Sequence, residues 1–190
     1  ISVINFIYNG TNWIDTNYRS HPQNMLPALG LITEPYPRTL HAAGQILIDG
    51  TVYLSAVPLR AGDVITNLVV SVSAIGIALT LSKLGVYDKL GNRLGLTAEL
   101  GTLLSTSLGQ KAAALTSPYT VTTSDVYYLA VVSKGSTLPT LHRGSNNVNI
   151  APAIGSRSIL FGPLVSQTDL PSSLTLAVGA SPINFWIGAY

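Results

Sequence analysis

The stretch Lys83-Leu-Gly-Val-Tyr-Asp-Lys-Leu-Gly-Asn-Arg-Leu94 decides the fold of this chain. Leu84 and Val86 fall on one face of an alternating pattern, which is typical of a half-buried strand. Asp88 and Gly91 bracket a reversal of the chain, because Asp accepts hydrogen bonds from turn amides and Gly tolerates a positive φ. The segment is therefore predicted to form a β-hairpin, and the turn explains both its acid and its glycine.

Strand patterns continue on both sides of this hairpin. Residues 45–56 are predicted to hold a first strand pair or one bent strand, closed by Pro58 and a turn at residues 60–63. Between Ala74 and Gly76 the apolar residues change parity, so a bulge or a connection between two strands is expected there. The unbroken apolar run Val126–Ser133 predicts a strand that is covered on both faces.

The remaining segments give weaker signals. Leucines within residues 97–110 recur at helical spacing, so a short helix and a surface loop both stay open. Pro118 indicates that the strand at residues 111–121 lies at a sheet edge or a bend, since proline cannot donate to a ladder. Residues 134–156 are rich in Gly, Pro and Asn and are predicted to be mainly loop. Three further strands are predicted at 158–165, 174–178 and 183–188.

The predicted fold is all-β: a jelly-roll-like antiparallel β-sandwich at residues 45–190, preceded by an extended N-terminal arm. Evenly spaced short strands without a repeat of about 20 to 50 residues favour a sandwich over a solenoid or propeller. Residues 1–44 carry irregularly placed Asn, Tyr and Pro, which disfavour a long helix or strand. Ile4, Phe6 and Trp13 make this arm too apolar for a freely solvated tail. We expect it to pack along a partner or into a larger assembly.

The composition favours a chain that covers part of its surface with copies of itself. Only 9% of the 190 residues are charged, where about 25% is usual, and 47% are apolar. An unusually apolar monomer is the alternative. Ten basic and eight acidic residues give a net charge of +2, and the basic ones are scattered, so no nucleic-acid partner is expected. The absence of cysteine excludes disulfides and thiolate chemistry.

No membrane insertion is expected from the two long uncharged stretches. Residues 64–82 alternate polar with β-branched residues, as a half-buried strand does. Residues 170–190 are interrupted by Pro171 and Pro182. Ile1–Trp13 has neither the basic start nor the unbroken apolar run of a secretory leader, so no leader is expected in it.

The residue types of common catalytic sites lack their partners in this sequence. His21, His41 and His142 have no second ligand at the spacing of a metal site. No Gly-x-Ser-x-Gly elbow and no phosphate-cradling glycine pattern occur. Several of the eight acidic residues fall in predicted turns, so a glycosidase carboxylate pair is unsupported. The chain is therefore expected to be non-enzymatic, with no metal and no cofactor.

One polar loop is the best place for ligand contact. Loops on a rigid sandwich commonly carry binding residues, and the predicted loop from Ser136 to Asn149 is rich in polar side chains. The candidates for contact with a receptor or glycan are His142, Arg143, Asn146 and Asn147.

Aromatic residues are the candidates for a subunit interface, because Tyr and Trp supply large contact area with a polar tip. Tyr127 and Tyr128 are neighbours on a strand, so at least one of them is expected in the core. For residues 185–190 a core-closing last strand is favoured over a receptor-contact surface. The interface candidates are Trp13, Tyr128, Trp186 and Tyr190.

Several segments, taken in order, resemble a domain common in structural proteins of tailed bacteriophages. They are Thr51-Val-Tyr-Leu-Ser-Ala-Val-Pro-Leu-Arg-Ala-Gly-Asp-Val-Ile-Thr-Asn-Leu68, the hairpin at 84–94, Pro118-Tyr-Thr-Val121 with Val126-Tyr-Tyr-Leu-Ala-Val-Val132, and Leu138-Pro-Thr-Leu141. The similarity rests on order and spacing, covers about residues 45–143, and extends more loosely to Tyr190. Residues 1–44 show no such similarity.

This resemblance implies a non-enzymatic fibre-head or receptor-binding domain on the virion surface, assembled in the host cytoplasm and displayed as a homotrimer. The N-terminal arm would join it to other virion proteins, and exposed loops would meet a glycan or protein of the host cell. No functional residue is carried over, because such loops vary with the host. The alternatives are a capsid spike or decoration protein that stabilises the head, a secreted carbohydrate-binding module, a tumour-necrosis-factor-like signalling trimer and a polysaccharide hydrolase.

Overall fold

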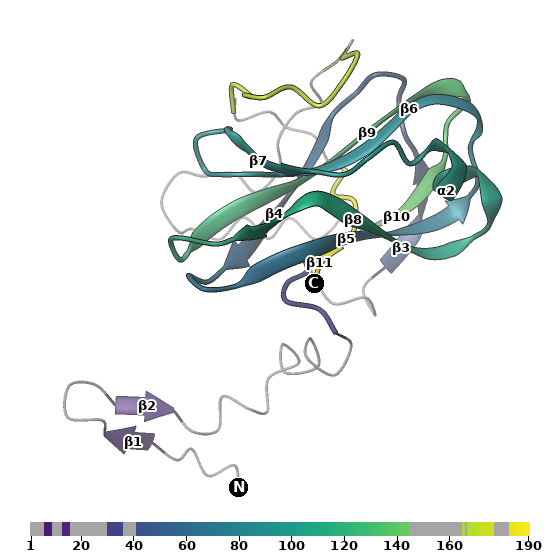
Figure 1. Cartoon of the computed structure of the whole chain (residues 1–190). Helices are drawn as coiled ribbons and strands as arrows, with labels where there is room; N and C mark the ends of the chain where they lie inside the picture. Colours follow the sequence, from purple (N-terminus) through teal and green to yellow (C-terminus); the bar gives the residue numbers. More distant parts are fainter. Residues whose placement is uncertain are drawn as a thin grey trace, which may run out of the picture.

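Two antiparallel sheets face each other and form a β-sandwich, which confirms the predicted fold (Figure 1). The computed structural model describes residues 6–8, 13–15, 30–35, 41–144, 165, 167–176 and 183–190. Within them the sandwich has one sheet of five strands and one of four, and β1 pairs with β2 in a two-stranded sheet. The elements are β1 Phe6–Tyr8, β2 Trp13–Asp15, β3 His41–Ile46, β4 Tyr53–Leu59, β5 Val64–Ala74, β6 Ile77–Tyr87, β7 Arg93–Leu96, α2 Gly101–Thr106, β8 Gly109–Thr120, β9 Asp125–Thr137, β10 Thr140–Gly144 and β11 Ile187–Ala189.

The predicted hairpin is confirmed as β6 and β7, which pair antiparallel in the four-stranded sheet β4-β9-β6-β7. Asp88 organises the turn, since its Oδ1 accepts hydrogen bonds from the amides of Leu90 and Asn92, both at 2.8 Å. Gly91 has a φ of 89°, a backbone conformation that side chains disfavour. Turn mechanics therefore account for both residues.

Replacing Asp88 with Asn is expected to make the stability of the protein less dependent on pH in acid. Burial alone would raise the pKa of this carboxyl, but hydrogen bonds from Asn92, Leu90 and Gly91 hold it below 3.8. A folded-state pKa below the unfolded one gives stability that is present above the unfolded pKa and lost as the pH falls through the folded pKa. At pH 7 the variant should lose about 1–2 kcal/mol in urea unfolding.

That difference should shrink as the pH falls below about 4, because the unfolded wild-type carboxyl then binds a proton and the folded carboxyl follows at its lower pKa. A difference between variant and wild type that stays constant from pH 7 to pH 3 would contradict the role given to the Asp88 charge.

Strand β9 is covered on both faces, as its unbroken apolar run predicted. Leu129 and Val131 point into the core between the two sheets. Tyr128, Ala130 and Val132 lie on the opposite face, in a second apolar cluster with Leu170 and Leu174. The second cluster exists because residues 167–176 cross the outer face of the four-stranded sheet. We call this segment the strap.

The five-stranded sheet is completed by the C-terminal strand β11. β10 pairs with β5 only near Leu141, and further along β5 its neighbour is β11, from Leu68 to Val70. Phe185 bridges to Arg143, and the amide of Trp186 donates to the carbonyl of His142 at 3.0 Å. The last residues therefore fill a gap that opens between β5 and β10.

The change of parity after Ala74 marks the connection between two strands, as expected. β5 ends at Ala74 in the five-stranded sheet, and β6 begins at Ile77 in the four-stranded one. The open question at residues 97–110 is answered by the short helix α2. β8 lies at the edge of the five-stranded sheet and contains Pro118, which confirms the edge predicted from that proline.

Two predictions about residues 45–58 are wrong. The strands on either side of the Asp49-Gly50 turn do not pair with each other, because β3 pairs with β10 while β4 pairs with β9 in the other sheet. A turn signal shows where the chain reverses and does not show which sheet it enters. Pro58 does not end its strand either, since β4 runs to Leu59 as an edge strand, and an edge tolerates a proline. The predicted turn at residues 60–63 follows directly and is confirmed, with the Asp63 amide donating to Arg60 O at 3.0 Å.

The predictions for the last third of the chain are met only in part. Residues 158–164 of one predicted strand lie outside the described residues. Residues 174–176, the described part of the next predicted strand, are not a strand. The pairing just before them is one isolated bridge between Ser173 and Asn92. The last strand is shorter than predicted and begins at Ile187.

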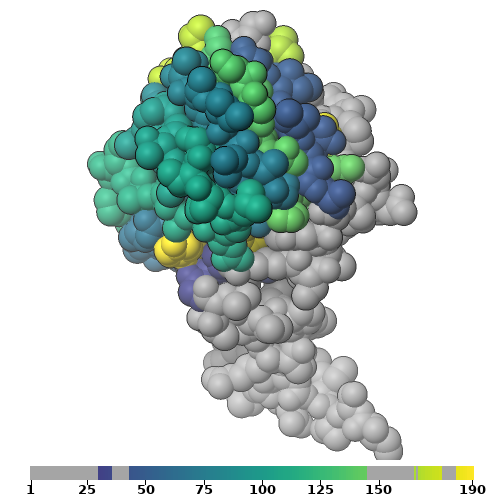
Figure 2. All heavy atoms as spheres, turned by 90° about the vertical axis from the view of Figure 1, so that its right-hand side faces the viewer, coloured from purple at the N-terminus to yellow at the C-terminus, as the bar shows by residue number. Residues whose placement is uncertain are grey.

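The described part of the arm includes a segment that lies against the sandwich. Leu31 and Thr33 are buried, and Thr33 bridges to Ala189 of β11. Figure 2 shows the purple atoms of residues 30–35 directly beside the yellow atoms of the C-terminal residues. β3 then begins at His41. The body of the domain therefore includes residues that precede position 45.

Candidate ligand-contact site

The prediction of a loop around His142 and Arg143 is wrong, because residues 140–144 pair with β3 and form strand β10, next to the C-terminal segment. β10 pairs with β3, and its register shifts between these two residues. Such a bulge changes the direction of side chains along a strand. Both residues are partly exposed. The structure thus brings the two candidates to a place where three strands of one sheet meet.

The ring of His142 is held by a neighbouring strand. Its Nδ1 lies 2.9 Å from Oγ of Ser71 on β5. Val70 and Val72 point into the core, so Ser71 between them lies on the outer face of the five-stranded sheet. The backbone carbonyl of His142 accepts from Trp186. Ring and backbone of His142 are therefore both fixed by strands far away in the sequence.

Arg143 is anchored through its backbone. It bridges to Phe185, and the next residue, Gly144, donates its amide to the carbonyl of Asn184 at 2.9 Å. A guanidinium presents several donors in a fixed plane, which suits carboxylates and phosphates. The other two candidates, Asn146 and Asn147, lie outside the described residues. Sequence reasoning did not name Ser71 or Asn184, because only the pairing of distant strands brings them here.

The Ser71–His142 pair differs from a catalytic one. In a serine hydrolase the His contacts the nucleophile through Nε2, and Nδ1 contacts an acid. Here Nδ1 faces the serine, and Ser71 is only 6% exposed. Within the described part of the chain no three His, Cys, Asp or Glu side chains gather as a metal site requires. The geometry around Ser71 favours a structural hydrogen bond.

Two of the four aromatic interface candidates are buried on the outer faces of the sheets, each beneath a covering segment of the same chain. Tyr128 is 3% exposed under the strap, and Trp186 is fully buried. Trp186 donates from Nε1 to Glu34 Oε2 at 2.9 Å. Tyr190 is partly exposed and packs against the cluster of Leu31, Val69 and Trp186. Trp13 belongs to β2, and nothing further is described of it.

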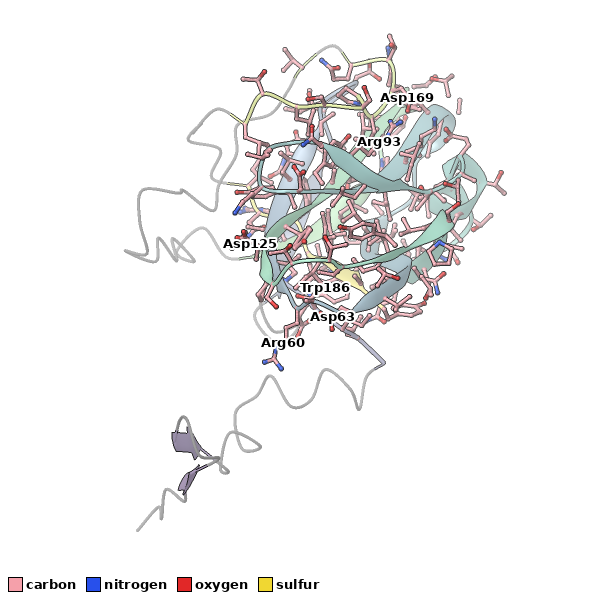
Figure 3. All side chains as sticks on the ribbon, turned by 60° about the vertical axis from the view of Figure 1, so that its left-hand side comes forward. Arg60, Asp63, Arg93, Asp125, Asp169 and Trp186 are labelled. Atoms are coloured by element: carbon pink, nitrogen blue, oxygen red, sulfur yellow. The ribbon has the colours of Figure 1, made fainter. Side chains whose placement is uncertain are left out.

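Three side-chain contacts fasten the strap to the four-stranded sheet. Tyr87 donates from its hydroxyl to Pro171 O at 2.7 Å, and a guanidinium nitrogen of Arg93 donates to Leu170 O. Lys83 forms an ion pair with Asp169 at 2.9 Å. Figure 3 shows Arg93 and Asp169 close together, on the opposite side of the sandwich from Arg60. The sequence pattern gave no sign of this segment, because its partners lie some eighty residues earlier.

The pKa shifts of Tyr87 and Asp169 are consistent with the position of the strap on the sheet. Burial raises the pKa of the Tyr87 phenol, and Arg93 offsets only part of that rise, so the hydroxyl remains a donor. Burial would raise the pKa of Asp169, but hydrogen bonds from Lys83 and the Leu170 amide lower it. Asp169 is therefore ionised at neutral pH and can hold its ion pair.

Comparisons with protein-family models, with curated proteins and with solved structures found no match. No helix in the described segments has the length and apolar character needed to cross a membrane. What is established is the class: a mostly-β protein whose two antiparallel sheets pack as a sandwich.

Proposed function

We propose that this protein is a non-enzymatic structural protein of a tailed-phage virion: an oligomeric fibre-head or receptor-binding domain that attaches through its N-terminal arm. Its residues around His142 and Arg143 would contact a glycan or protein on the host surface. A homotrimer is the oligomer that the sequence resemblance implies.

One observation carries this proposal. The segments that resemble phage structural proteins are scattered along the sequence, yet three of them are adjacent strands in space: Thr51–Leu59 supplies β4, the hairpin supplies β6 and β7, and Val126–Val132 supplies β9. Together they contribute residues to every strand of the four-stranded sheet. A similarity confined to unrelated local hairpins would have no reason to assemble one sheet.

The exposed surface supports an oligomer. Ile77 is 59% exposed, Leu108 is 61% exposed and Leu90 is 71% exposed, in a chain with few charges. Exposing large aliphatic side chains to water is unfavourable, and contacts with further copies of the chain would remove them from water. This supports self-association without selecting its symmetry.

The contact chemistry favours an acidic ligand. Arg143 carries a permanent positive charge on a strand whose backbone is fixed, and guanidinium groups bind carboxylates and phosphates through paired hydrogen bonds. Because its strand does not need to be ordered on binding, little entropy would be lost there. Acidic glycans of a cell surface fit this description.

Replacing Arg143 with Ala is expected to weaken binding to an acidic bacterial surface glycan roughly tenfold or more, because a charge-assisted hydrogen bond is lost. The measurement is the Kd of the purified full chain against a panel of immobilised lipopolysaccharides and capsular polysaccharides. Arg60→Ala is the matched control, because Arg60 is exposed and its backbone amide, which bonds to Asp63, remains.

The control should bind as the wild type does. An equal loss in both variants would mean that net charge alone acts, and no binding by the wild type to any glycan or bacterial surface would contradict the proposed contact. Light scattering on the same samples checks the oligomer, and a stable monomer at micromolar concentration would contradict self-association.

A further inference from the structure

A short segment fastens the N-terminal arm to both sheets at once. We call Leu31–Glu34 the arm root. The amide of Ile32 donates to Ala189 O at 2.8 Å, and the amide of Ala189 donates back to Thr33 O at 3.0 Å. On the other sheet, Thr33 Oγ1 donates to Pro58 O of β4 at 2.9 Å. The arm root therefore spans the gap between β11 and β4.

Side chains complete this attachment. Leu31 is 3% exposed and packs with Val69 and Trp186. The carboxylate of Glu34 accepts the indole N–H of Trp186. Trp186 is fully buried, so this hydrogen bond satisfies a donor that would otherwise lose its partner in the interior.

The arm root has a definite boundary on each side. Gly30 precedes it with a φ of 73°, a backbone conformation that glycine adopts easily, and nothing lies within 4 Å of the position of a Cβ there. The chain therefore changes direction at Gly30 without contacting the sandwich at that point. Pro35 follows it and has no amide to donate, so the pairing with β11 cannot continue past Glu34. Between these two residues lies a single short piece of extended chain.

We propose that the arm root opens and closes as one unit while both sheets stay folded. Among the described residues its backbone pairing involves Ile32, Thr33 and Ala189, whereas β9 pairs with β4 from Asp125 to Val131 and with β6 from Tyr128 to Thr137. Segments with few buried contacts open locally at lower free energy than the core strands. Opening frees the arm, uncovers Trp186 and leaves one side of β11 without its partner. This inference concerns the arm and does not depend on ligand binding at β10.

Hydrogen exchange of the full chain tests whether the unit is separate. In the wild type, the amides of Ile32 and Ala189 should exchange at least about tenfold faster than those of Leu129 and Val131 in β9. In Glu34→Ala the arm root should exchange about tenfold faster again, since a charge-assisted hydrogen bond is lost, while β9 keeps its rate. Equal acceleration of both regions, or arm-root exchange as slow as that of β9, would overturn the proposal.

Glu99→Ala is the matched control. Glu99 also accepts one hydrogen bond, from the Gly101 amide at 3.1 Å, but it lies beside α2 and away from the arm root. Its loss should leave Ile32 and Ala189 unchanged. An acceleration there as large as in Glu34→Ala would show that any lost acceptor loosens the arm, and the unit would not be separate.

A disulfide provides the second test. The chain has no cysteine, and Thr33 and Ala189 are bridge partners, so Thr33→Cys with Ala189→Cys offers a clean cross-link. Oxidation should form an intramolecular bond and slow the exchange of Ile32 to the rate of β9, and reduction should restore the fast rate. Bonds formed between chains, seen as dimers on a non-reducing gel, would overturn the assignment of the arm root to its own sandwich.

Discussion

Replacing Trp186 with Ala is expected to destabilise the protein by about 3–5 kcal/mol, measured by urea unfolding. The side chain is fully buried and is among the largest in the interior. Truncation leaves a cavity beside Leu31 and Val69 and removes the donor to Glu34. Because Trp186 also sits next to the strand that closes the five-stranded sheet, the lost packing would loosen β11 itself.

Trp186→Phe is the control, because it retains most of the ring and loses the N–H donor. The free energy of unfolding should fall by at most about half as much in this variant as in Trp186→Ala. The same pair of variants distinguishes a core residue from an interface residue. If the main role of Trp186 were to contact a second copy, the loss of stability would depend strongly on protein concentration, and the variant would dissociate to a folded monomer.

Gly91→Ala is expected to destabilise the protein by about 3–5 kcal/mol. Two costs combine: Ala must adopt a φ of 89°, and its Cβ would lie 2.0 Å from the backbone oxygen of Leu174. That contact is impossible, so the strap must move, and Leu174 would lose its buried position on the sheet. Thermal or urea unfolding measures the combined loss.

Gly62→Ala separates the two costs. Gly62 has a φ of 93° and nothing within 4 Å of an added Cβ, so the variant carries the backbone strain alone. It should lose about 1–2 kcal/mol. If the two variants lost equal amounts, the turn would not be packed against the strap, and the position of residues 167–176 would be refuted.

The parts of the fold that could be predicted are those in which the signal is local. The hairpin turn contains its own acceptor and its own glycine within four residues, so Asp88 and Gly91 were interpreted correctly. The burial of both faces of β9 could also be predicted from local sequence, because Tyr128 and Leu129 are large, largely apolar neighbours whose side chains lie on opposite faces of one strand. Each of these features is determined by residues that are consecutive in the sequence.

The parts that could not be predicted depend on which distant strands become neighbours. Residues 45–48 and 51–56 have the pattern of a hairpin, yet each pairs with a different strand from beyond residue 124. The contact site shows the same limit. His142 was proposed as a contact residue because its neighbours in sequence are polar, but only the pairing of distant strands brings Ser71 and Asn184 close to β10. Strand alternation fixes the face of a side chain and leaves its neighbour undetermined.

The gap that β11 fills has a consequence for how the chain reaches its native state. β5 ends at residue 74 of the 190-residue chain, but its neighbour from Leu68 to Val70 is β11, more than a hundred residues later. Until that partner arrives, folding intermediates present an open edge of apolar strand, which is the kind of surface that recruits other chains into aggregates. Fragments that end before residue 183 should therefore precipitate during expression, and full-length chains should refold slowly and in better yield when dilute.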